Sequence, residues 1–397
     1  MVVSRHALRA VTGMLATSVL LAGCTSSDAN APASSPTESA VSHAAGPLPA
    51  APGQAPAPAC GDPAAAVAAM STRDKLAQLL MVGVTGADDA RAVVDSQHVG
   101  GIMIGSWTDL SMVNGPLADI AANAGPLPLA VSVDEEGGRV SRLASVIGSQ
   151  PAPRALAATD TPEQVYQIAL DRGRKMRGLG ITIDFAPVVD VTDAPDDTVI
   201  GDRSFGADPT KVTDYAGAYA RGLRDAGLLP VLKHFPGHGH GDGDSHAGSV
   251  VTPPLEDLKA DDLVPYRTLT TQGPVAVMVG HMEVPGLTGS EPASLSPAAY
   301  ALLRSGDYGG PPFGGIVFTD DLSSMKAISG RFGVADAVLR SLQAGADVAL
   351  WVTTTEVPAV LDRLEKAVAA GELSQQAVDA SVTKLAAMKG PSPRCGG

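Results

Sequence analysis

The sequence predicts an α/β fold, a (β/α)8 TIM barrel that forms a single catalytic domain. Three observations lead to this prediction. Eight short apolar runs occur between residues 79 and 352, helical segments separate them, and ionisable residues stand at or directly after the ends of five runs. Runs that are almost continuously apolar are typical of parallel strands covered on both faces. In this fold, the chemistry collects at the carboxyl ends of the strands.

Each apolar run has the length of a strand and lacks a polar alternation. The runs are 79–84, 99–104, 127–133, 181–189, 228–235, 276–282, 315–318 and 348–352. Helices are expected at 87–96, 109–124, 161–178, 209–226, 255–271, 296–305, 333–344, 355–370 and 373–388. A doubly wound open sheet is the alternative, but no GxGxxG or Walker motif follows a strand, which disfavours it.

The amino terminus has the features of an export signal. Arg5 and Arg9 come before an apolar run over 11–21, and Leu-Ala-Gly-Cys over 21–24 resembles the lipobox of bacterial lipoproteins. We expect residues 1–23 to be a signal peptide and Cys24 to carry a lipid anchor, on the extracytoplasmic side of a bacterial cell membrane. An ordinary signal peptide with an incidental cysteine is the alternative.

The segment 24–59 has the composition of a tether. Residues 25–59 include 11 Ala, 7 Pro and 6 Ser, with only two charged residues and no hydrophobic periodicity. The folded domain is therefore expected at 60–397. Cys60 and Cys395 bracket it, and in an oxidising compartment they are candidates for a disulfide that joins its ends, with two free thiols as the alternative.

Composition excludes several classes of protein. The net charge of −14 argues against sequence-independent nucleic-acid binding, which needs a basic surface. Three cysteines are too few for a disulfide-dense scaffold or a four-cysteine zinc site. A hydrophobic content of 45% is sufficient for a large buried core.

Polar residues follow the strands where a barrel enzyme needs them. A single one of these residues has an alternative interpretation as a helix cap or a solvated loop charge, but five strands share the feature. The residues, in strand order, are Asp134, Asp190, Lys233 with His234, His281, and Asp320 with Asp321.

The segment 233–246 is the most informative, since four histidines fall within 13 residues of a glycine-rich loop. One interpretation is a metal site with histidine and aspartate ligands. The other is acid/base chemistry, in which Asp244 orients and charges His246. The absence of an HExxH motif and of a histidine pair on a helix disfavours the metal site.

Four segments together resemble glycoside hydrolase family 3, specifically its single-domain β-N-acetylglucosaminidase (β-hexosaminidase) branch. The first is KHFPGHG at 233–239 with Asp-Ser-His at 244–246. The others, which occur in the family's order, are DEEGGRVSR at 134–142, IGDRSF at 200–205 and VFTDDLS at 317–323. The resemblance covers about 62–390. Its departures are Glu135 and Ser141, where the family usually has Gln, and Thr319, where it usually has Ser.

The resemblance implies a role for each matching residue. Asp320 would be the nucleophile, and Asp244 and His246 would form the acid/base dyad. The residues that would hold the terminal sugar are Asp134, Arg142, Arg203, Lys233 and His234. Lys233 and Arg203 are expected to keep Asp320 ionised.

The implied function is retaining exo-hydrolysis of terminal β-GlcNAc from peptidoglycan-derived muropeptides or disaccharides, through a glycosyl-enzyme intermediate. We expect a monomer without metal or organic cofactor. Another β-glycosidase of the family, such as a β-glucosidase, is the alternative. A metal-dependent hydrolase and a non-catalytic glycan-binding lipoprotein are disfavoured, the latter because all of the implied catalytic residues are present.

Overall fold

The computed structural model describes residues 60–395. The predicted signal peptide, the predicted tether and the proposed lipid attachment at Cys24 lie outside the described residues, so they stay predictions. Among the residues described, no helix is both long enough and apolar enough to cross a bilayer.

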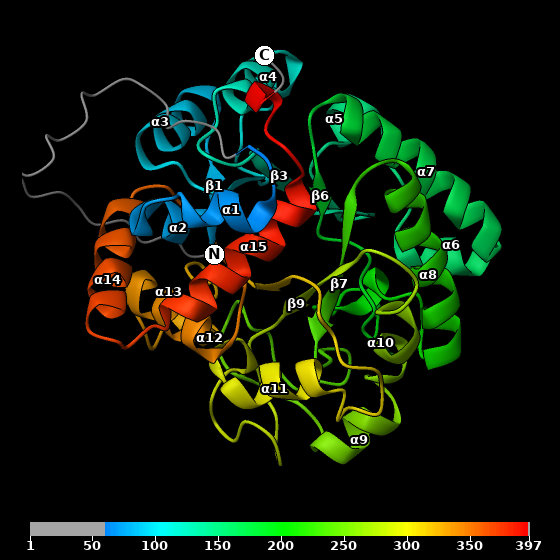
Figure 1. The fold of residues 1–397 in the computed structure, drawn as a ribbon. Coiled ribbons are helices and arrows are strands. Elements are labelled where there is room, and N and C mark those ends of the chain that lie inside the picture. Colours follow the sequence, from blue (N-terminus) through cyan, green and yellow to red (C-terminus); the bar gives the residue numbers. More distant parts are fainter. Residues whose placement is uncertain (1–59, 396–397) are drawn as a thin grey trace, which may run out of the picture. The chain divides into compact units, whose positions relative to one another are not determined.

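Eight parallel strands form a barrel, which confirms the predicted fold (Figure 1). Their order in the sheet is their order in the chain, and a bridge between Phe318 and Val348 brings the last two strands together. Each strand coincides with one of the eight predicted runs, and only β11 extends past its run, by one residue. The strands are β1 (Leu80–Val84), β2 (Gly101–Ile104), β3 (Ala130–Val133), β6 (Ile183–Asp184), β7 (Leu229–Phe235), β9 (Ala276–Val279), β11 (Val317–Thr319) and β12 (Ala349–Trp351).

Helices surround the strands, as Figure 1 shows. Those of eight or more residues are α3 (Ala87–Gln97), α7 (Pro162–Gly178), α8 (Pro209–Asp225), α11 (Pro297–Ser305), α13 (Val334–Ala344), α14 (Val357–Ala369) and α15 (Gln375–Lys389). Shorter helices are α1 (Pro63–Ala68), α2 (Thr72–Gln78), α4 (Pro116–Ala122), α5 (Ala144–Ile147), α6 (Pro153–Thr159), α9 (Leu255–Ala260), α10 (Val264–Leu269) and α12 (Lys326–Ser329). Buried apolar residues of the strands and of the inward helix faces form one continuous core.

Two of the predicted helices are broken, so the prediction of continuous helices over 109–124 and 255–271 was wrong. The first splits into a 3-10 turn over Leu110–Asn114 and α4, because Gly115 has a φ of 137° and Pro116 follows it. The second splits into α9 and α10, and Pro265 stands in the first turn of α10. Proline supplies no N–H and crowds the preceding turn, so it favours a new helix start over continuation.

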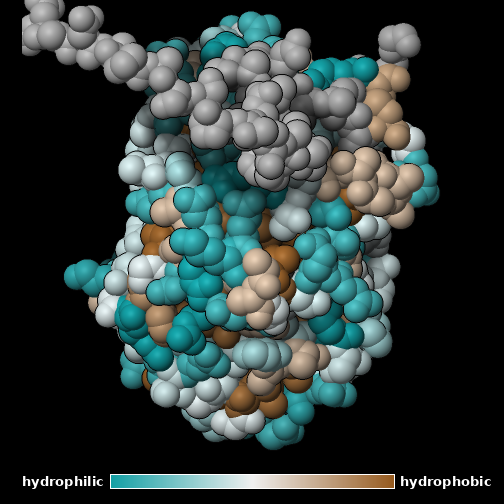
Figure 2. Space-filling model, turned by 60° about the vertical axis from the view of Figure 1, so that its left-hand side comes forward, coloured by the Kyte–Doolittle hydropathy of each residue, from teal (hydrophilic) through white to brown (hydrophobic). Residues whose placement is uncertain are grey.

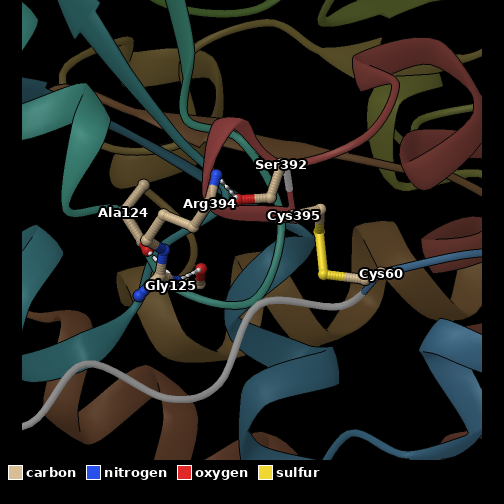
Figure 3. The surroundings of a disulfide bond; sticks show 6 residues. All are labelled: Cys60, Ala124, Gly125, Ser392, Arg394 and Cys395. Atoms are coloured by element: carbon tan, nitrogen blue, oxygen red, sulfur yellow. Dashed lines mark hydrogen bonds between the residues drawn. A yellow bond between two sulfur atoms is a disulfide. The ribbon is translucent and has the colours of Figure 1, made fainter. Parts of the chain in front are cut away.

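The two ends of the domain are joined. A disulfide links Cys60 to Cys395, 335 residues apart in the sequence (Figure 3). Next to it, the Arg394 guanidinium donates hydrogen bonds to the carbonyl oxygens of Ala124 (2.7 Å) and Gly125 (2.6 Å). A cross-link over so long a loop removes conformational entropy from the unfolded chain, and thereby stabilises the fold.

The surface carries few exposed apolar side chains. On the face in Figure 2, hydrophilic residues predominate and the brown areas are small and separated. Among the described residues, the exposed large hydrophobic side chains are those of Trp107, Val146 and Val251. Scattered exposure of this kind is ordinary, so a single exposed residue matters only where its position is unusual.

Candidate active site

A cavity of about 370 Å³ opens among the loops that follow β3, β6, β7 and β11. The structure brings all eight residues predicted for catalysis and sugar binding to its lining. They are Asp134, Arg142, Arg203, Lys233, His234, Asp244, His246 and Asp320. The predicted disulfide pair and Cys24 belong to other parts of the chain. A cavity at the carboxyl ends of barrel strands is where this fold places its chemistry.

A network of buried charges forms the wall of the cavity over β3 and β7. The Lys233 ammonium lies 2.6 Å from Asp134 Oδ1 and 2.6 Å from Glu136 Oε1. Arg203 donates two hydrogen bonds to Glu136, Nε to Oε2 at 2.8 Å and Nη2 to Oε1 at 2.9 Å. We call these four residues, together with His234, the strand-end cluster.

Ion pairing keeps the buried side chains of this cluster in their charged forms. Burial would lower the pKa of Lys233, but the carboxylates of Asp134 and Glu136 outweigh it and raise that pKa. Burial would raise the pKa of Glu136, but Arg203 and Lys233 outweigh it, and the pKa lies well below its usual range. The cluster therefore presents fixed charges to a ligand at neutral pH, at no cost of rearrangement when the ligand arrives.

Glu136 is a member of this site that the sequence analysis did not single out. It lies in the short strand β4 (Glu135–Gly137), which pairs with β5 (Val140–Ser141) in a hairpin directly after Asp134. Its position two residues after a strand-end aspartate is the only signal in the sequence. The neighbouring Glu135 faces away from the cavity and binds Arg172, Ser141 and two backbone N–H groups.

Asp190 fixes the orientation of His234. Its Oδ2 lies 2.7 Å from His234 Nδ1, and its Oδ1 accepts from the backbone N–H groups of His234 (3.2 Å) and His238 (2.8 Å). Burial would raise the pKa of Asp190, but its histidine neighbours and hydrogen bonds bring it below the usual value. With Nδ1 held by Asp190, Nε2 of His234 lies 3.5 Å from Arg203 Nη2, and both residues line the cavity.

Asp320 directly follows β11 and is half-buried at the cavity wall. Burial would raise its pKa, but His281, His234, the backbone N–H of Asp321 and Lys233 outweigh burial and lower the pKa to about 2. Asp320 is thus an ionised carboxylate at neutral pH. Arg203, expected to contribute to this, instead has Glu136 as its ion-pair partner.

The next residue, Asp321, has a different environment. Its carboxylate accepts hydrogen bonds from the backbone N–H and hydroxyl groups of Ser323 and Ser324, so it caps the turn after β11. His281, a predicted strand-end residue, is also outside the cavity lining. It is buried with Nδ1 2.7 Å from Ser294 Oγ and Nε2 2.8 Å from the Asp321 carbonyl oxygen, and burial lowers its pKa.

The Asp244–His246 pair, which we call the loop dyad, lies on the segment after β7. His246 Nδ1 is 2.7 Å from Asp244 Oδ1, which also accepts from the His246 backbone N–H at 2.9 Å. Burial would raise the pKa of Asp244, but these hydrogen bonds lower it. Asp244 is therefore ionised and holds Nδ1, which leaves Nε2 of His246 available for proton transfer.

Two contacts tie this loop to its surroundings. Asp242 and Val251 exchange backbone hydrogen bonds, and Ser245 O accepts from the Ala327 N–H at 3.1 Å. The loop thus crosses from β7 to the segment after β11, where Asp320 lies. Between residues 60 and 395, no group of three or more His, Cys, Asp and Glu side chains is arranged to hold a metal ion.

The remaining predicted residue, Arg142, lines the cavity beside this network. Its backbone N–H donates to Glu135 (2.7 Å), and its buried Nε has no hydrogen-bond partner among residues 60–395. His238 likewise lines the cavity with two buried ring nitrogens that lack partners in this part of the chain. An ionised carboxylate, a separate histidine proton donor and fixed polar groups are the parts that glycosidic bond cleavage with retention requires.

Comparison with known proteins identifies the family of this chain. Residues 71–388 match the family described as glycosyl hydrolase family 3 N terminal domain. The chain belongs to glycosyl hydrolase family 3. A relative named Beta-hexosaminidase LpqI, from Mycobacterium tuberculosis, is 69% identical over 363 residues, which span 91% of this chain and 94% of the relative. The predicted family and the prediction of a glycoside hydrolase are confirmed.

Solved structures agree with this membership. The M. tuberculosis LpqI structure superposes with a TM-score of 0.84 at 71% identity, over 86% of this chain and 100% of that one. A family 3 member from Mycobacterium smegmatis gives 0.82 at 77% identity, over 82% and 99%. A β-N-acetylglucosaminidase from Paenibacillus gives 0.75 at 36% identity, over 81% of this chain and 62% of that one.

Proposed function

We propose that the protein is a retaining exo-β-N-acetylglucosaminidase that removes terminal β-GlcNAc from muropeptides or their disaccharide cores. The observation that carries the proposal is that the ionised Asp320, the loop dyad and the strand-end cluster all line one cavity. The names of the relatives, Beta-hexosaminidase and β-N-acetylglucosaminidase, support the acetamido sugar.

In the first half-reaction, an Asp320 carboxylate oxygen bonds to C1 of the terminal sugar while the C1–O bond to the leaving sugar breaks. His246, protonated, gives its Nε2 proton to the departing oxygen. Asp244 stabilises the imidazolium before the transfer through its contact with Nδ1. The products are a glycosyl-Asp320 ester and a neutral leaving sugar.

In the second half-reaction, the neutral His246 takes a proton from a water molecule, whose oxygen attacks C1. The bond from C1 to Asp320 breaks, and the carboxylate is regenerated together with the imidazolium. Two displacements at C1 give net retention of configuration. The strand-end cluster holds the hydroxyls of the sugar in place throughout, with Lys233 and Arg203 as donors and Asp134 as acceptor.

The cellular setting is part of the proposal. We infer export through residues 1–23 and lipid attachment at Cys24, which would place the cavity next to peptidoglycan. A monomer as the working unit is also part of the proposal. Mass spectrometry of the amino-terminal peptide, size exclusion of the purified protein, and release of a Cys24→Ser variant from membranes test these points.

The deciding experiment compares β-GlcNAc and β-glucose substrates side by side. We expect hydrolysis of GlcNAc–MurNAc disaccharides with retention of configuration, which NMR shows as the anomer of GlcNAc that forms first. After reaction with a 5-fluoro GlcNAc substrate, we expect the peptide that contains Asp320 to carry the sugar as an acylal ester. Preference for the glucoside would contradict the acetamido assignment. Loss of activity with EDTA would favour a metal-dependent hydrolase instead.

A further inference from the structure

The mouth of the barrel contains an exposed tryptophan that the proposed reaction does not use. Trp107 is 43% exposed and stands three residues after the end of β2, at the catalytic end of the barrel. The chain has only two tryptophans, and the other, Trp351, is fully buried. An exposed indole at the end of the barrel that contains the proposed active site has a position that calls for an explanation.

The ring lies against backbone that only glycine permits. A Cβ placed on Gly83 would come within 2.8 Å of Trp107 Cζ2, and one on Gly105 would collide with three indole atoms. Glycines on β1 and directly after β2 thus allow the indole to lie close on the strand ends. Side chains at both positions would lift the ring away.

These contacts place the indole in the mouth of the barrel and not among the outer helices. Ser132 Oγ on β3 donates to Met81 Sδ on β1, although β2 lies between those strands. Side chains meet across an intervening strand on the inside of a barrel, so Met81 faces inward. Gly83, two residues further along β1, faces the same way, and the ring therefore covers the barrel interior.

The loop that carries the indole is held firmly. Thr108 Oγ1 donates to the Val84 carbonyl oxygen at 2.6 Å and accepts from the Gly105 N–H at 3.0 Å. Asp109 N–H donates to the Thr85 carbonyl oxygen at 2.9 Å. Trp107 is thus bracketed by residues that are tied to the end of β1, so the ring can serve as a fixed surface.

The indole belongs to the side of the mouth that contributes no residue to the cavity lining. Around the barrel, β12, β1 and β2 stand between β11, which precedes Asp320, and β3, which precedes Asp134. None of the residues that line the cavity within 60–395 comes from the segments after these three strands. Trp107 occupies that sector.

The inference also places the leaving sugar in this sector. The strand-end cluster holds the terminal sugar on the β3 and β7 side, and the loop dyad rests on the segment after β11. In the proposed reaction the bond to be cut lies between Asp320 and His246, and for the indole to contact it the leaving sugar must extend past β11 toward β12 and β1. The flat C–H face of a pyranose carries slight positive charge and packs well on the negative face of an aromatic ring.

We propose that Trp107 is the stacking surface for the leaving sugar of the substrate, and so determines preference for disaccharides. The inference depends on the proposed glycosidase function for its reaction and on the geometry above for its site. It predicts that truncation of Trp107 lowers kcat/KM for a substrate whose leaving group is a sugar, and lowers it much less for a substrate whose leaving group is not a sugar.

The test compares kcat/KM for GlcNAc-β-1,4-MurNAc with kcat/KM for β-GlcNAc fluoride, whose leaving group is a single atom. We expect Trp107→Ala to lower the ratio of the two values about tenfold, and Trp107→Phe to lower it less. Val146→Ala, which truncates another exposed apolar side chain, is the matched control and should leave the ratio unchanged.

An equal loss on both substrates with Trp107→Ala would mean that the indole only covers the barrel core, and would overturn the proposal. A wild-type protein that hydrolyses neither substrate would instead contradict the proposed function. In that case tryptophan fluorescence still tests whether the leaving sugar contacts Trp107, because Trp107 is the exposed tryptophan. Titration of Asp320→Asn protein with the disaccharide should change the emission. Absence of any change that depends on Trp107 would overturn the proposal.

Discussion

The strand-end cluster and the loop dyad differ in how they are held. Side chains of Lys233 and Glu136 are 2% and 1% exposed, and each has at least two charged partners. Side chains of His246 and Asp244 are 61% and 47% exposed, and their ion pair is with each other. The cluster belongs to the packed end of the barrel, whereas the dyad lies on a loop outside it.

This difference separates two requirements of the reaction. A terminal sugar is bound best by groups that do not reorganise, and buried pairs provide that. A proton donor must reach the scissile oxygen and also let substrate in, which suits a loop. The comparison implies that changes in the cluster affect both folding and chemistry, whereas changes in the dyad affect chemistry alone.

The largest expected effect is at Asp320, which lies between the two regions. Asp320→Asn should lower kcat by about 10⁴-fold or more, because the variant has no carboxylate to bond to C1. The melting temperature should change little, since Asp320 is half-buried and its carboxylate accepts a hydrogen bond from the Asp321 N–H, which the amide oxygen of Asn can also accept. Initial rates on GlcNAc–MurNAc and a thermal melt are the measurements.

The adjacent Asp321 is the matched control for this variant. Asp321→Asn replaces one of the two oxygens that accept from Ser323 and Ser324 with an NH2 group, so it should lower stability and retain much of the turnover at low temperature. Full activity in Asp320→Asn would disprove the assignment of the nucleophile.

The second prediction tests the cluster. Glu136→Gln leaves Arg203 and Lys233 with a partner that is no longer an anion, and should lower the free energy of unfolding by about 3–5 kcal/mol at neutral pH. Because the folded pKa of Glu136 is below its ordinary 4.5, the stabilisation is present above that pH. The difference between wild type and variant should therefore shrink as the pH falls below about 4.5, in urea titrations at several pH values.

A weaker third effect is expected for the dyad. His246→Ala should lower kcat/KM by about 10²-fold on a sugar leaving group, and less on an activated leaving group that needs no proton. Its melting temperature should match that of wild type because the side chain is exposed. A loss of stability as large as that of Glu136→Gln would contradict the view that the dyad contributes to the chemistry and not to folding.

Much of this arrangement was accessible from the chain itself. The strands could be predicted because parallel strands buried on both faces are apolar without interruption, and the eight barrel strands coincide with such runs. The dyad and Asp320 could be located because segments such as 233–246 resemble a known family. Helix breaks near Pro116 and Pro265 were missed, although proline is a helix-start signal.

Other features depend on contacts that span the chain. Glu136 and Lys233 are 97 residues apart, and only the closed barrel brings them together. Asp190 was expected at the strand ends, but its role as the partner of His234 and of the His238 N–H depends on how β7 continues past the barrel. His281 matched the strand-end pattern and is nevertheless buried, since periodicity does not determine which side of a strand end a side chain takes.

The smallest effect concerns Asp184, which lies at the end of β6 beneath the cluster. It is fully buried, its Oδ1 accepts from the Glu135 N–H at 3.0 Å, and Oδ2 has no partner among residues 60–395. Burial raises the pKa of this carboxyl well above its usual value, and the nearby carboxylates of Glu135 and Asp134 add to the shift. Asp184 is therefore the one carboxyl under the cluster for which folding favours the neutral form.

A raised carboxyl pKa makes the fold less stable as the pH rises, because the unfolded chain releases the proton at a lower pH than the folded one. Asp184→Asn resembles the neutral acid and has no proton to lose. It should raise the free energy of unfolding by about 1 kcal/mol or more at pH 7, and by much less at pH 3.5, where this carboxyl is mostly protonated in the unfolded chain as well. Urea titrations of both proteins at the two pH values measure this. Destabilisation at pH 7 would instead mean that Asp184 is ionised and is a charged partner of Lys233, and the cluster would then contain one more anion than its contacts indicate.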